Sequence, residues 1–303
     1  MRVSGKKLRL MKGTDTYRFA ERMHDYASLF SCASWTRMLQ SGRPADVEMV
    51  YGKYDERGRL GENITYMDYL KWVYRYLLRS YRNEYIYKNE LVDKYIIRFF
   101  GKTDSVAVNE FRVGSTIADL ALFNGESKCF EIKSELDTPR RLSMQLSNYR
   151  KVFDKCYILV PEESCDAYKT MVDERVGILV FRYCKNGQVG ICQEREAIRN
   201  EQVDVNVLMC SVRTSEYRWM VRQAYGTLPD VSDFDMFDAC RDLLGALSAE
   251  QLHHLFCGAI KTRKTRVGDL IETAPIFRQM SLGMNMGRNG MVQMDRMLNQ
   301  VMV

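Results

Sequence analysis

Residues 109–149 contain the pattern that most constrains the fold. Two short apolar runs, 115–123 (STIADLALF) and 128–134 (KCFEIKS), are separated by a turn at Asn124 and Gly125. Asn and Gly tolerate the positive φ of a tight hairpin turn, so the two runs predict paired strands. Each strand carries an acid near its centre, Asp119 in the first and Glu131 in the second. A carboxylate among apolar neighbours is costly to bury alone, so we expect a cation or a hydrogen-bond donor beside it.

The second strand supplies the expected cation. Glu131 and Lys133 are two residues apart, so their side chains project from the same face of a strand, about 6.5–7 Å apart. If Asp119 lies on the neighbouring strand, two carboxylates converge on a hard divalent cation such as Mg²⁺ or Mn²⁺. Lys133 would then stand beside the ion, where it can hold a phosphate oxygen or orient the attacking water.

The order of these residues resembles that of a known family. Asp119 is followed twelve residues later by Glu131-Ile132-Lys133, and then by a predicted helix that carries Gln145 and Tyr149. This pattern resembles the PD-(D/E)XK superfamily of restriction-endonuclease-like nucleases, although Ala118 stands where the superfamily usually has Pro. Further residues are similar to a little-characterised bacterial branch of that superfamily: Ser134, Asp137, Arg141 and Leu142.

The resemblance covers roughly residues 84–182 and implies both a fold and a site. The implied fold is α/β, with a mixed-sheet restriction-endonuclease-like core. The implied catalytic residues are Asp119, Glu131, Lys133 and Gln145, with Gln145 acting near Lys133, and Tyr149 is a supporting residue. The superfamily often has one more acid on the helix before the first core strand.

Two residues are candidates for this additional metal ligand. Glu90 lies in a predicted helix that ends at Gly101. Glu110 is the alternative, because it lies on the predicted strand 105–113 and reaches the same place from the sheet. For both residues an ordinary surface carboxylate is the competing interpretation.

A helix is predicted over residues 139–155. Thr138 provides an N-cap hydroxyl and Pro139 suits the first helical position. One stripe of this helix is apolar and predicts packing on the sheet. Another side is cationic and predicts contacts with the phosphates of a nucleic acid, through Arg140, Arg141, Arg150 and Lys151.

The rest of the chain divides into three predicted regions. Residues 1–83 form an N-terminal helical region, with helices over about 15–39 and 65–81 and a polar loop between them. Residues 84–198 form the α/β core, in which 155–162 reads as a central strand, 176–183 as the next strand and 187–192 as an edge strand. Residues 199–303 form a C-terminal helical region with a Met- and Gly-rich tail.

Three segments of the flanks carry alternative interpretations. The basic start with Lys6, Lys7, Arg9 and Lys12, and the basic cluster at 261–266, either contact nucleic acid or are simply solvated. The Met-rich tail, 279–303, is either an adaptable partner-binding surface or a flexible end. A homodimer or a protein partner bound through the C-terminal region therefore stays open.

Composition narrows the class of protein. Hydrophobic residues make up 46% of the 303 residues, which is enough for a packed core. The formal net charge of +6 permits nucleic-acid binding without requiring it. Nine cysteines without a C-x-x-C pair, and three histidines, argue against a zinc site and a disulfide framework. No apolar run approaches the ~18 residues of a membrane span, and we expect a cytoplasmic protein from a bacterium or phage.

The sequence thus predicts a metal-dependent phosphodiesterase, either an endonuclease or an exonuclease, with DNA as the expected substrate. The alternative is a catalytically silent nuclease-fold module that binds nucleic acid or a protein partner. Because a pair of carboxylates repels a polyanion, their presence with Lys133 favours the enzyme. A helical adaptor with a chance Glu-x-Lys is the third interpretation.

Overall fold

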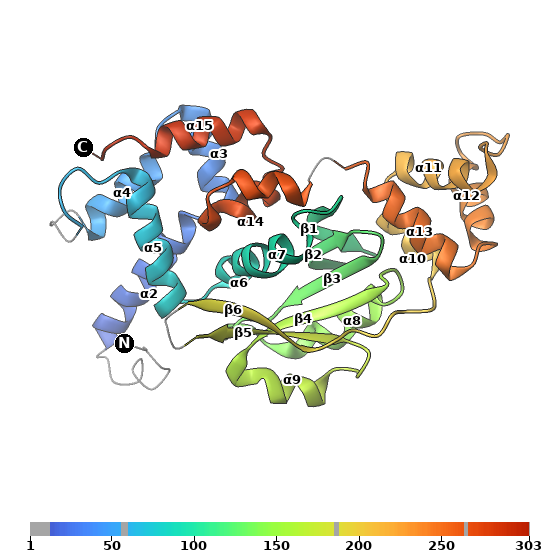
Figure 1. Cartoon of the computed structure of the whole chain (residues 1–303), viewed down its shortest axis with the longest axis horizontal. Coiled ribbons are helices and arrows are strands. Elements are labelled where there is room, and N and C mark those ends of the chain that lie inside the picture. The colour runs from blue at the N-terminus through green and yellow to red at the C-terminus, as the bar shows by residue number, and fades with distance from the viewer. Residues whose placement is uncertain (1–12, 56–59, 185–187, 264–265, 303) are drawn as a thin grey trace. The chain divides into compact units, whose positions relative to one another are not determined.

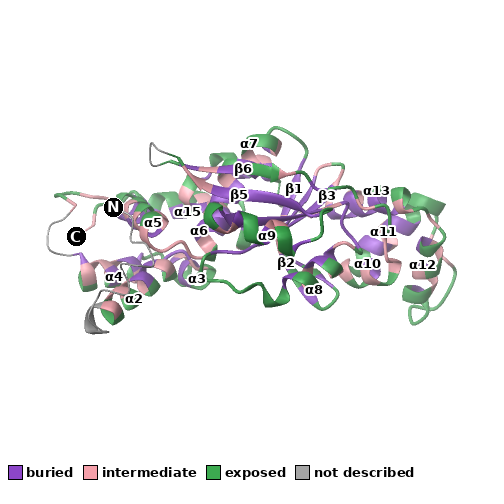
Figure 2. Ribbon diagram, turned by 90° about the horizontal axis from the view of Figure 1, so that it is seen from below, coloured by how far each residue is buried: buried purple, intermediate pink, exposed green. Residues whose placement is uncertain are grey.

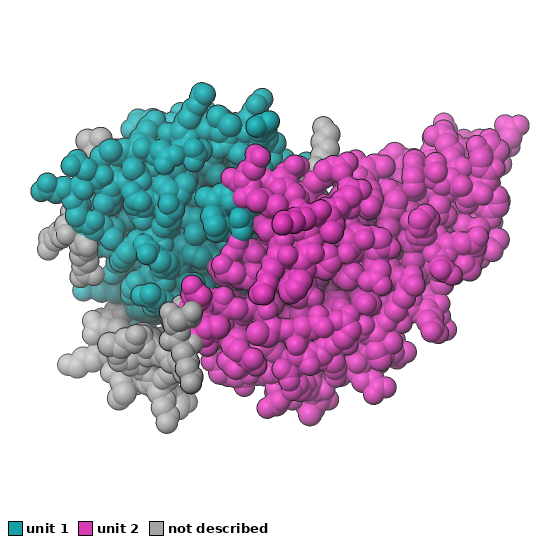
Figure 3. Space-filling view, in the orientation of Figure 1, with its two compact units in different colours: residues 1–89, 273–303 teal, residues 90–272 magenta. Residues whose placement is uncertain are grey.

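The computed structural model describes residues 13–55, 60–184, 188–263 and 266–302. The chain divides into two compact units, one of residues 1–89 with 273–303 and the other of residues 90–272 (Figure 3). These units do not coincide with the three predicted regions, because 199–272 belongs with the sheet and 273–303 with the N-terminal helices. The basic residues Lys6, Lys7, Arg9 and Lys12 lie outside the described residues.

The second unit is built on one mixed six-stranded sheet, which confirms the predicted α/β class (Figure 1). Its strands lie in sequence order: β1 (Val106–Val113), β2 (Thr116–Phe123), β3 (Ser127–Ile132), β4 (Lys155–Pro161), β5 (Gly177–Tyr183) and β6 (Val189–Arg195). The first three strands form an antiparallel meander, β3, β4 and β5 run parallel, and β6 returns antiparallel at the edge. Gly125 has a φ of +102° in the predicted hairpin turn between β2 and β3.

Twelve short helical segments among the described residues belong to this unit in whole or in part. Before the sheet come the end of α6 (Glu84–Leu91), the π-helical turn η1 (Val92–Ile96) and α7 (Ile97–Phe100). Between strands lie η2 (Pro139–Arg141), α8 (Leu142–Tyr149), η3 (Glu162–Ser164) and α9 (Cys165–Met171). After the sheet follow α10 (Val205–Ser211), α11 (Thr214–Tyr225), α12 (Met236–Gly245), α13 (Ala249–Ile260) and η4 (Val267–Glu272).

Side chains on the two faces of the sheet pack against different helices. On one face, Cys129, Ile158 and Ile178 belong to an apolar core that also includes residues of α8 to α13. On the other face, Phe130 stacks on Tyr157, with ring centroids 5.5 Å apart, and contacts Tyr95 of η1. Figure 2 shows that the strands are largely buried between these layers. Residues that alternate along β3 therefore point to opposite layers.

The helices after the sheet are part of its core rather than an appendage. Phe256 of α13 packs edge-on against Phe111 and Phe123, with ring centroids 5.9 and 5.2 Å apart. Such aromatic pairs stabilise a core beyond the area they bury. The helical periodicity of 204–261 predicts these helices, but it does not indicate which surface they cover.

The first unit consists of helices only among its described residues. They are α2 (Gly13–Ser28), α3 (Cys32–Ser41), α4 (Ala45–Tyr54), α5 (Tyr66–Ser80), most of α6, η5 (Pro275–Phe277), α14 (Arg278–Gly283) and α15 (Arg288–Leu298). The prediction of a single helix over 15–39 was wrong, because Ser31 breaks it and caps α3 through the backbone N–H of Ser34. The predicted loop before Gly61 contains α4.

A buried acid organises the N-terminal helices. Asp55 accepts hydrogen bonds from the hydroxyls of Tyr26 (2.6 Å) and Tyr69 (2.9 Å) and from Arg22 (2.6 Å). Because a buried carboxylate is stable only with such partners, this network fixes α2, α4 and α5 together. The aromatic residues of α5 thus serve the core of this unit.

The Met-rich tail has a definite structure in its described part. Met280, Met294 and Met297 are buried, and α15 packs on α3 and α5 within the first unit. The tail is therefore neither a flexible end nor a freely exposed methionine surface. Within the described residues, no helix is both long and apolar enough for a membrane crossing.

One buried histidine predicts how stability depends on pH. His253 of α13 is buried, its Nδ1 lies 3.4 Å from Oδ2 of Asp154, and among the described residues neither ring nitrogen has a partner with the geometry of a full hydrogen bond. Asp154 itself accepts hydrogen bonds from the backbone N–H and the hydroxyl of Ser127 and from Arg199. Burial lowers the pKa of His253 from its ordinary value of 6.5, and the charge of Asp154 and the backbone of Asn200 offset this only in part.

We expect the protein to lose stability as the pH falls below about 6.5. The unfolded chain binds a proton at His253 more readily than the folded chain, so the free energy of unfolding falls with pH by at most about 1.4 kcal/mol per pH unit. Urea unfolding at pH 7.5, 6.5 and 5.5 measures this slope. His253→Gln should flatten it, whereas His254→Gln, an exposed neighbour on the same helix, should not. Equal slopes in both variants would contradict the assignment.

Candidate functional site

The two predicted acids lie where β2 and β3 separate. The ladder of paired residues between these strands ends at Leu120 and Phe130, so the next residues, Asp119 and Glu131, face each other beyond it. Oδ2 of Asp119 accepts a hydrogen bond of 2.7 Å from the backbone N–H of Ile132. The half-buried Asp119 side chain therefore replaces a backbone acceptor at the point where the strands diverge.

Glu131 is the centre of a buried polar network. Its Oε1 accepts hydrogen bonds from Nζ of Lys133 (2.8 Å) and Nε2 of Gln145 (2.6 Å). Its Oε2 accepts one from the hydroxyl of Tyr149 (2.8 Å). Lys133 also donates to Oε1 of Gln145 (3.2 Å). The structure thus brings together four of the residues that the sequence singled out, and it supplies the compensating cation.

Both acids influence the pKa of the Tyr149 hydroxyl. Burial raises the pKa of this phenol strongly, and the negative charges of Glu131 and Asp119 raise it further. The hydroxyl also lies 2.6 Å from the carbonyl oxygen of Ile117, two residues before Asp119. Tyr149 therefore stays protonated and donates its hydroxyl hydrogen. It joins α8 to β2 and β3 at the point where these strands separate, which we call the fork.

The two carboxylates of the site are ligands of the type that a hard divalent cation prefers. Mg²⁺ is usually held by one or two carboxylates and keeps several waters. Asp119 and Glu131 supply two such carboxylates, and the buried ammonium of Lys133 shows that positive charge is stable beside Glu131. Within the described part of the chain, no three His, Cys, Asp or Glu side chains gather closely enough to hold a metal ion. Neither Glu90 nor Glu110 therefore completes a three-acid site in this structure.

Glu110 lies opposite Asp119 in an unusual backbone conformation. Its neighbours Asn109 and Phe111 pair with Leu120 and Ala118, so Glu110 faces Asp119 across β1 and β2. Its φ is +55°, which is sparsely populated by residues other than Gly and is often found near functional sites. The apolar residues of β1 that face the core change register here, from Val106 and Val108 to Phe111 and Val113.

We expect relief of this strain to stabilise the protein. Glu110→Gly removes the side chain that disfavours positive φ and should raise the free energy of unfolding by about 1 kcal/mol relative to Glu110→Gln. Both variants lose the carboxylate, so their difference isolates the backbone effect. Urea denaturation of the pair measures it. A glycine variant no more stable than the glutamine variant would show that the strand carries no strain.

Glu90 occupies a different environment. It lies in α6 and is buried. The helical turns that follow it place Tyr95 against Phe130, on the face of β3 opposite Glu131. The prediction that Glu90 binds the ion stays a prediction.

The predicted cationic side of helix 139–155 is not continuous. Pro139–Arg141 form a 3-10 turn without a side-chain cap from Thr138, and α8 ends at Tyr149. Arg140 and Arg141 are exposed before α8, whereas Arg150 and Lys151 follow it at the other end. A helix of this length spans about 12 Å, so the four cations form two separate pairs.

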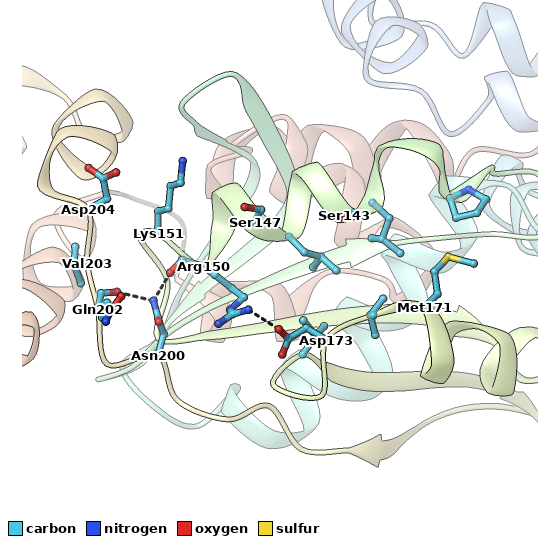
Figure 4. A pocket seen from close by; sticks show the side chains of 15 residues that line it. Ser143, Ser147, Arg150, Lys151, Met171, Asp173, Asn200, Gln202, Val203 and Asp204 are labelled. Carbon is cyan, nitrogen blue, oxygen red and sulfur yellow. Dashed lines mark hydrogen bonds and ion pairs between the residues drawn. The ribbon is translucent and has the colours of Figure 1, made fainter.

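The second pair borders a pocket of about 610 Å³ between α8, the end of α9 and residues 200–204 (Figure 4). Arg150 is bound there to Asp173 (3.1 Å), and Lys151 lies at the rim. Asp119, Glu131 and Lys133 do not line this pocket. Arg150 is therefore less available for phosphate contacts than the sequence suggests, while Arg140 and Arg141 remain open to solvent.

The basic cluster at 261–266 is largely neutralised in its described part. Lys261 and Arg266 form ion pairs with Asp104, and Arg263 forms a bidentate pair with Glu216. Residues 264–265 lie outside the described residues. These contacts favour a structural role, because they join the segment after α13 to the residue Asp104 before β1 and to α11.

A family model described as bacteriophage P4 protein cII matches residues 78–282, which is more than half of the chain. The chain belongs to the phage P4 cII family. The matched range includes the whole fork between β2 and β3, α8 and the helices that follow the sheet.

One curated protein and one solved structure are similar to parts of this cII-family chain. Protein cII of Enterobacteria phage P4 is 34% identical over 82 residues, which are 26% of this chain and 31% of that protein. The match thus spans about a third of the length of the curated relative. A solved structure, the SPO1766 protein of unknown function from Silicibacter pomeroyi, is 16% identical with a TM-score of 0.31, covering 46% of this chain and 90% of that one.

Proposed function

We propose that this cII-family chain is a divalent-metal-dependent nuclease that hydrolyses phosphodiester bonds in DNA. The observation that carries the proposal is the fork between β2 and β3, where Asp119, Glu131, Lys133, Gln145 and Tyr149 come together. Three separate segments of the chain contribute these residues. The buried positions of Glu131 and Lys133 cost free energy that packing alone does not require.

Each residue has a role that follows from its contacts. Asp119 and Glu131 would hold Mg²⁺ or Mn²⁺, and a bound ion supplies Lewis-acid activation of the phosphate and of water. Lys133 holds an ammonium beside Glu131 and can transfer its hydrogen bond to a phosphate oxygen, where negative charge grows during hydrolysis. Gln145 donates to Glu131 and accepts from Lys133, so it fixes the positions of both. Tyr149 anchors the carboxylate from the other side.

A second candidate function rests on the same network. Both oxygens of Glu131 already have partners, and this carboxylate is only 3% exposed. A satisfied buried network is also what a silent fold would keep to specify its structure. In that case the chain binds nucleic acid or a protein without cutting.

Cleavage assays separate the two functions. Labelled single-stranded DNA, duplex DNA, branched DNA and RNA are incubated with the protein in Mg²⁺, in Mn²⁺ and in EDTA. A nuclease gives shortened products of at least one substrate with metal and none with EDTA. Absence of products from every substrate, by a protein that still binds nucleic acid, would favour the silent module.

A further inference from the structure

The three segments that carry the candidate site also carry exposed apolar side chains. Ile117, Leu136 and Met144 are exposed by 42%, 58% and 53%. Ile117 is two residues from Asp119, Leu136 is three residues from Lys133, and Met144 is next to Gln145. Exposed apolar residues on the segments that carry a site are the ones a ligand of that site can contact.

Hydrogen bonds join the backbone of two of these residues to groups in or next to the network. The carbonyl of Ile117 lies against the Tyr149 hydroxyl, which donates to Glu131. The backbone N–H of Leu136 donates to Oγ of Ser134, the residue that follows Lys133, at 3.2 Å. The backbone of Ile117 and that of Leu136 are therefore hydrogen-bonded to groups of the site or directly beside it.

The acid network is narrow and enclosed. Glu131 is 3% and Lys133 7% exposed, and their neighbours Asp119 and Gln145 are half-buried. A phosphodiester group must approach past these half-buried residues. A double helix presents its phosphates on a wide, stiff cylinder, whereas a flexible single strand can bring one phosphate at a time to a buried group.

The exposed residues near the site, which we call the rim residues, also suit a single strand. In a duplex the apolar faces of the bases are stacked and hidden, so exposed Ile, Leu and Met side chains gain little from it. Unpaired bases offer these faces for contact, and such contacts tolerate any sequence. Exposed cations for the phosphates lie in the same region: Arg112, which pairs with Ile117 across β1 and β2, and Arg140 and Arg141 before α8.

We propose that the site takes single-stranded DNA, with Ile117, Leu136 and Met144 contacting unpaired bases and Arg112, Arg140 and Arg141 contacting phosphates. This inference rests on the proposed nuclease function, because it names the substrate of the same site. It goes further in naming a single-stranded substrate and in assigning binding roles to four more residues outside the acid network, Arg112, Ile117, Leu136 and Met144.

Fluorescence anisotropy tests the proposal. A labelled 20-nucleotide strand and a duplex of the same sequence are titrated with the protein in Ca²⁺, chosen to limit cleavage. We expect at least tenfold tighter binding of the single strand. Leu136→Ser with Met144→Ser should weaken that binding about tenfold or more, in the range that loss of base contacts produces, and should leave the salt dependence unchanged. Arg140→Ala with Arg141→Ala should instead lower the salt slope by about 0.7 for each lost contact.

Met171→Ser is the matched control, because Met171 is 52% exposed but lines the pocket beyond α8. It should bind the single strand like the wild type. Equal or tighter binding of the duplex, or a rim variant that binds like the control, overturns the single-strand assignment while the nuclease proposal stands. A protein that cuts RNA but not DNA overturns the DNA assignment only. Failure to bind or cut any nucleic acid overturns both.

Discussion

Lys133→Met is expected to slow cleavage by about 10²- to 10³-fold, the usual effect of removing one group that stabilises transition-state charge. Its affinity for uncut DNA in Ca²⁺ should fall by about tenfold at most, as for a single phosphate contact. The variant leaves the buried Glu131 without its counter-ion, which is expected to lower stability, but Glu131 keeps its hydrogen bonds from Gln145 and Tyr149. Cleavage rates are therefore compared per folded molecule, measured by circular dichroism of the same samples. Single-turnover kinetics and anisotropy measure the two effects separately.

Lys128→Met is the matched control for this experiment. Lys128 is another buried lysine of β3, and it is bound to Glu126 rather than to the acid network. Its replacement should leave the cleavage rate per folded molecule unchanged. If Lys133→Met cut as fast as Lys128→Met, Lys133 would have no part in chemistry.

Asp119→Asn should abolish detectable cleavage while the fold persists. The amide oxygen of Asn can still accept the hydrogen bond from Ile132 N–H that Oδ2 of Asp119 accepts, so the fork keeps its backbone contact. The lost charge removes one of two metal ligands, which is expected to raise the barrier by several kcal/mol. Quenched cleavage assays with circular dichroism of the same samples measure both properties.

Asp204→Asn controls for the general effect of removing an acid. Asp204 also accepts backbone N–H groups, at the start of α10, and lies outside the network. It should retain full activity. Comparable loss of activity in both variants would attribute the effect of Asp119→Asn to the fold rather than to the site.

Local patterns predict the sheet and much of the site, because they depend on neighbours in sequence. The Asn124-Gly125 turn places the two acidic strands side by side, and the two-residue spacing puts Glu131 and Lys133 on one face. The family resemblance added Gln145 and Tyr149, and in the structure both donate hydrogen bonds from α8 to Glu131.

Other features depend on tertiary packing, which periodicity does not encode. No residue type around Glu110 indicates a positive φ, since the conformation arises where β1 and β2 lose their pairing. The helix expected through residue 155 ends at Tyr149, and the following turn buries Val152 and Phe153 under the sheet. The sequence also does not predict the burial of His253, because a single histidine in a helix gives no indication of the buried Asp154 beside it.

The enclosure of the acid network is the property that sequence reasoning missed most. Alternation predicts that Glu131 and Lys133 share a face, but not that α8 covers that face and leaves them almost inaccessible. The burial of these side chains favours a single-stranded substrate over a duplex. It also supports the silent-module interpretation. Glu131→Ala would be a poor test of the chemistry. It leaves Lys133 buried without its counter-ion and is expected to cost about 3–5 kcal/mol of stability.

Calorimetric titration with Mn²⁺ tests the central claim most directly, because it asks whether Asp119 and Glu131 form an ion site without relying on any substrate. Wild type, Asp119→Asn and Asp204→Asn are titrated under one condition. The account predicts one Mn²⁺ site in the wild type and in Asp204→Asn, and an affinity at least tenfold weaker in Asp119→Asn. Equal Mn²⁺ affinity in all three proteins would contradict it.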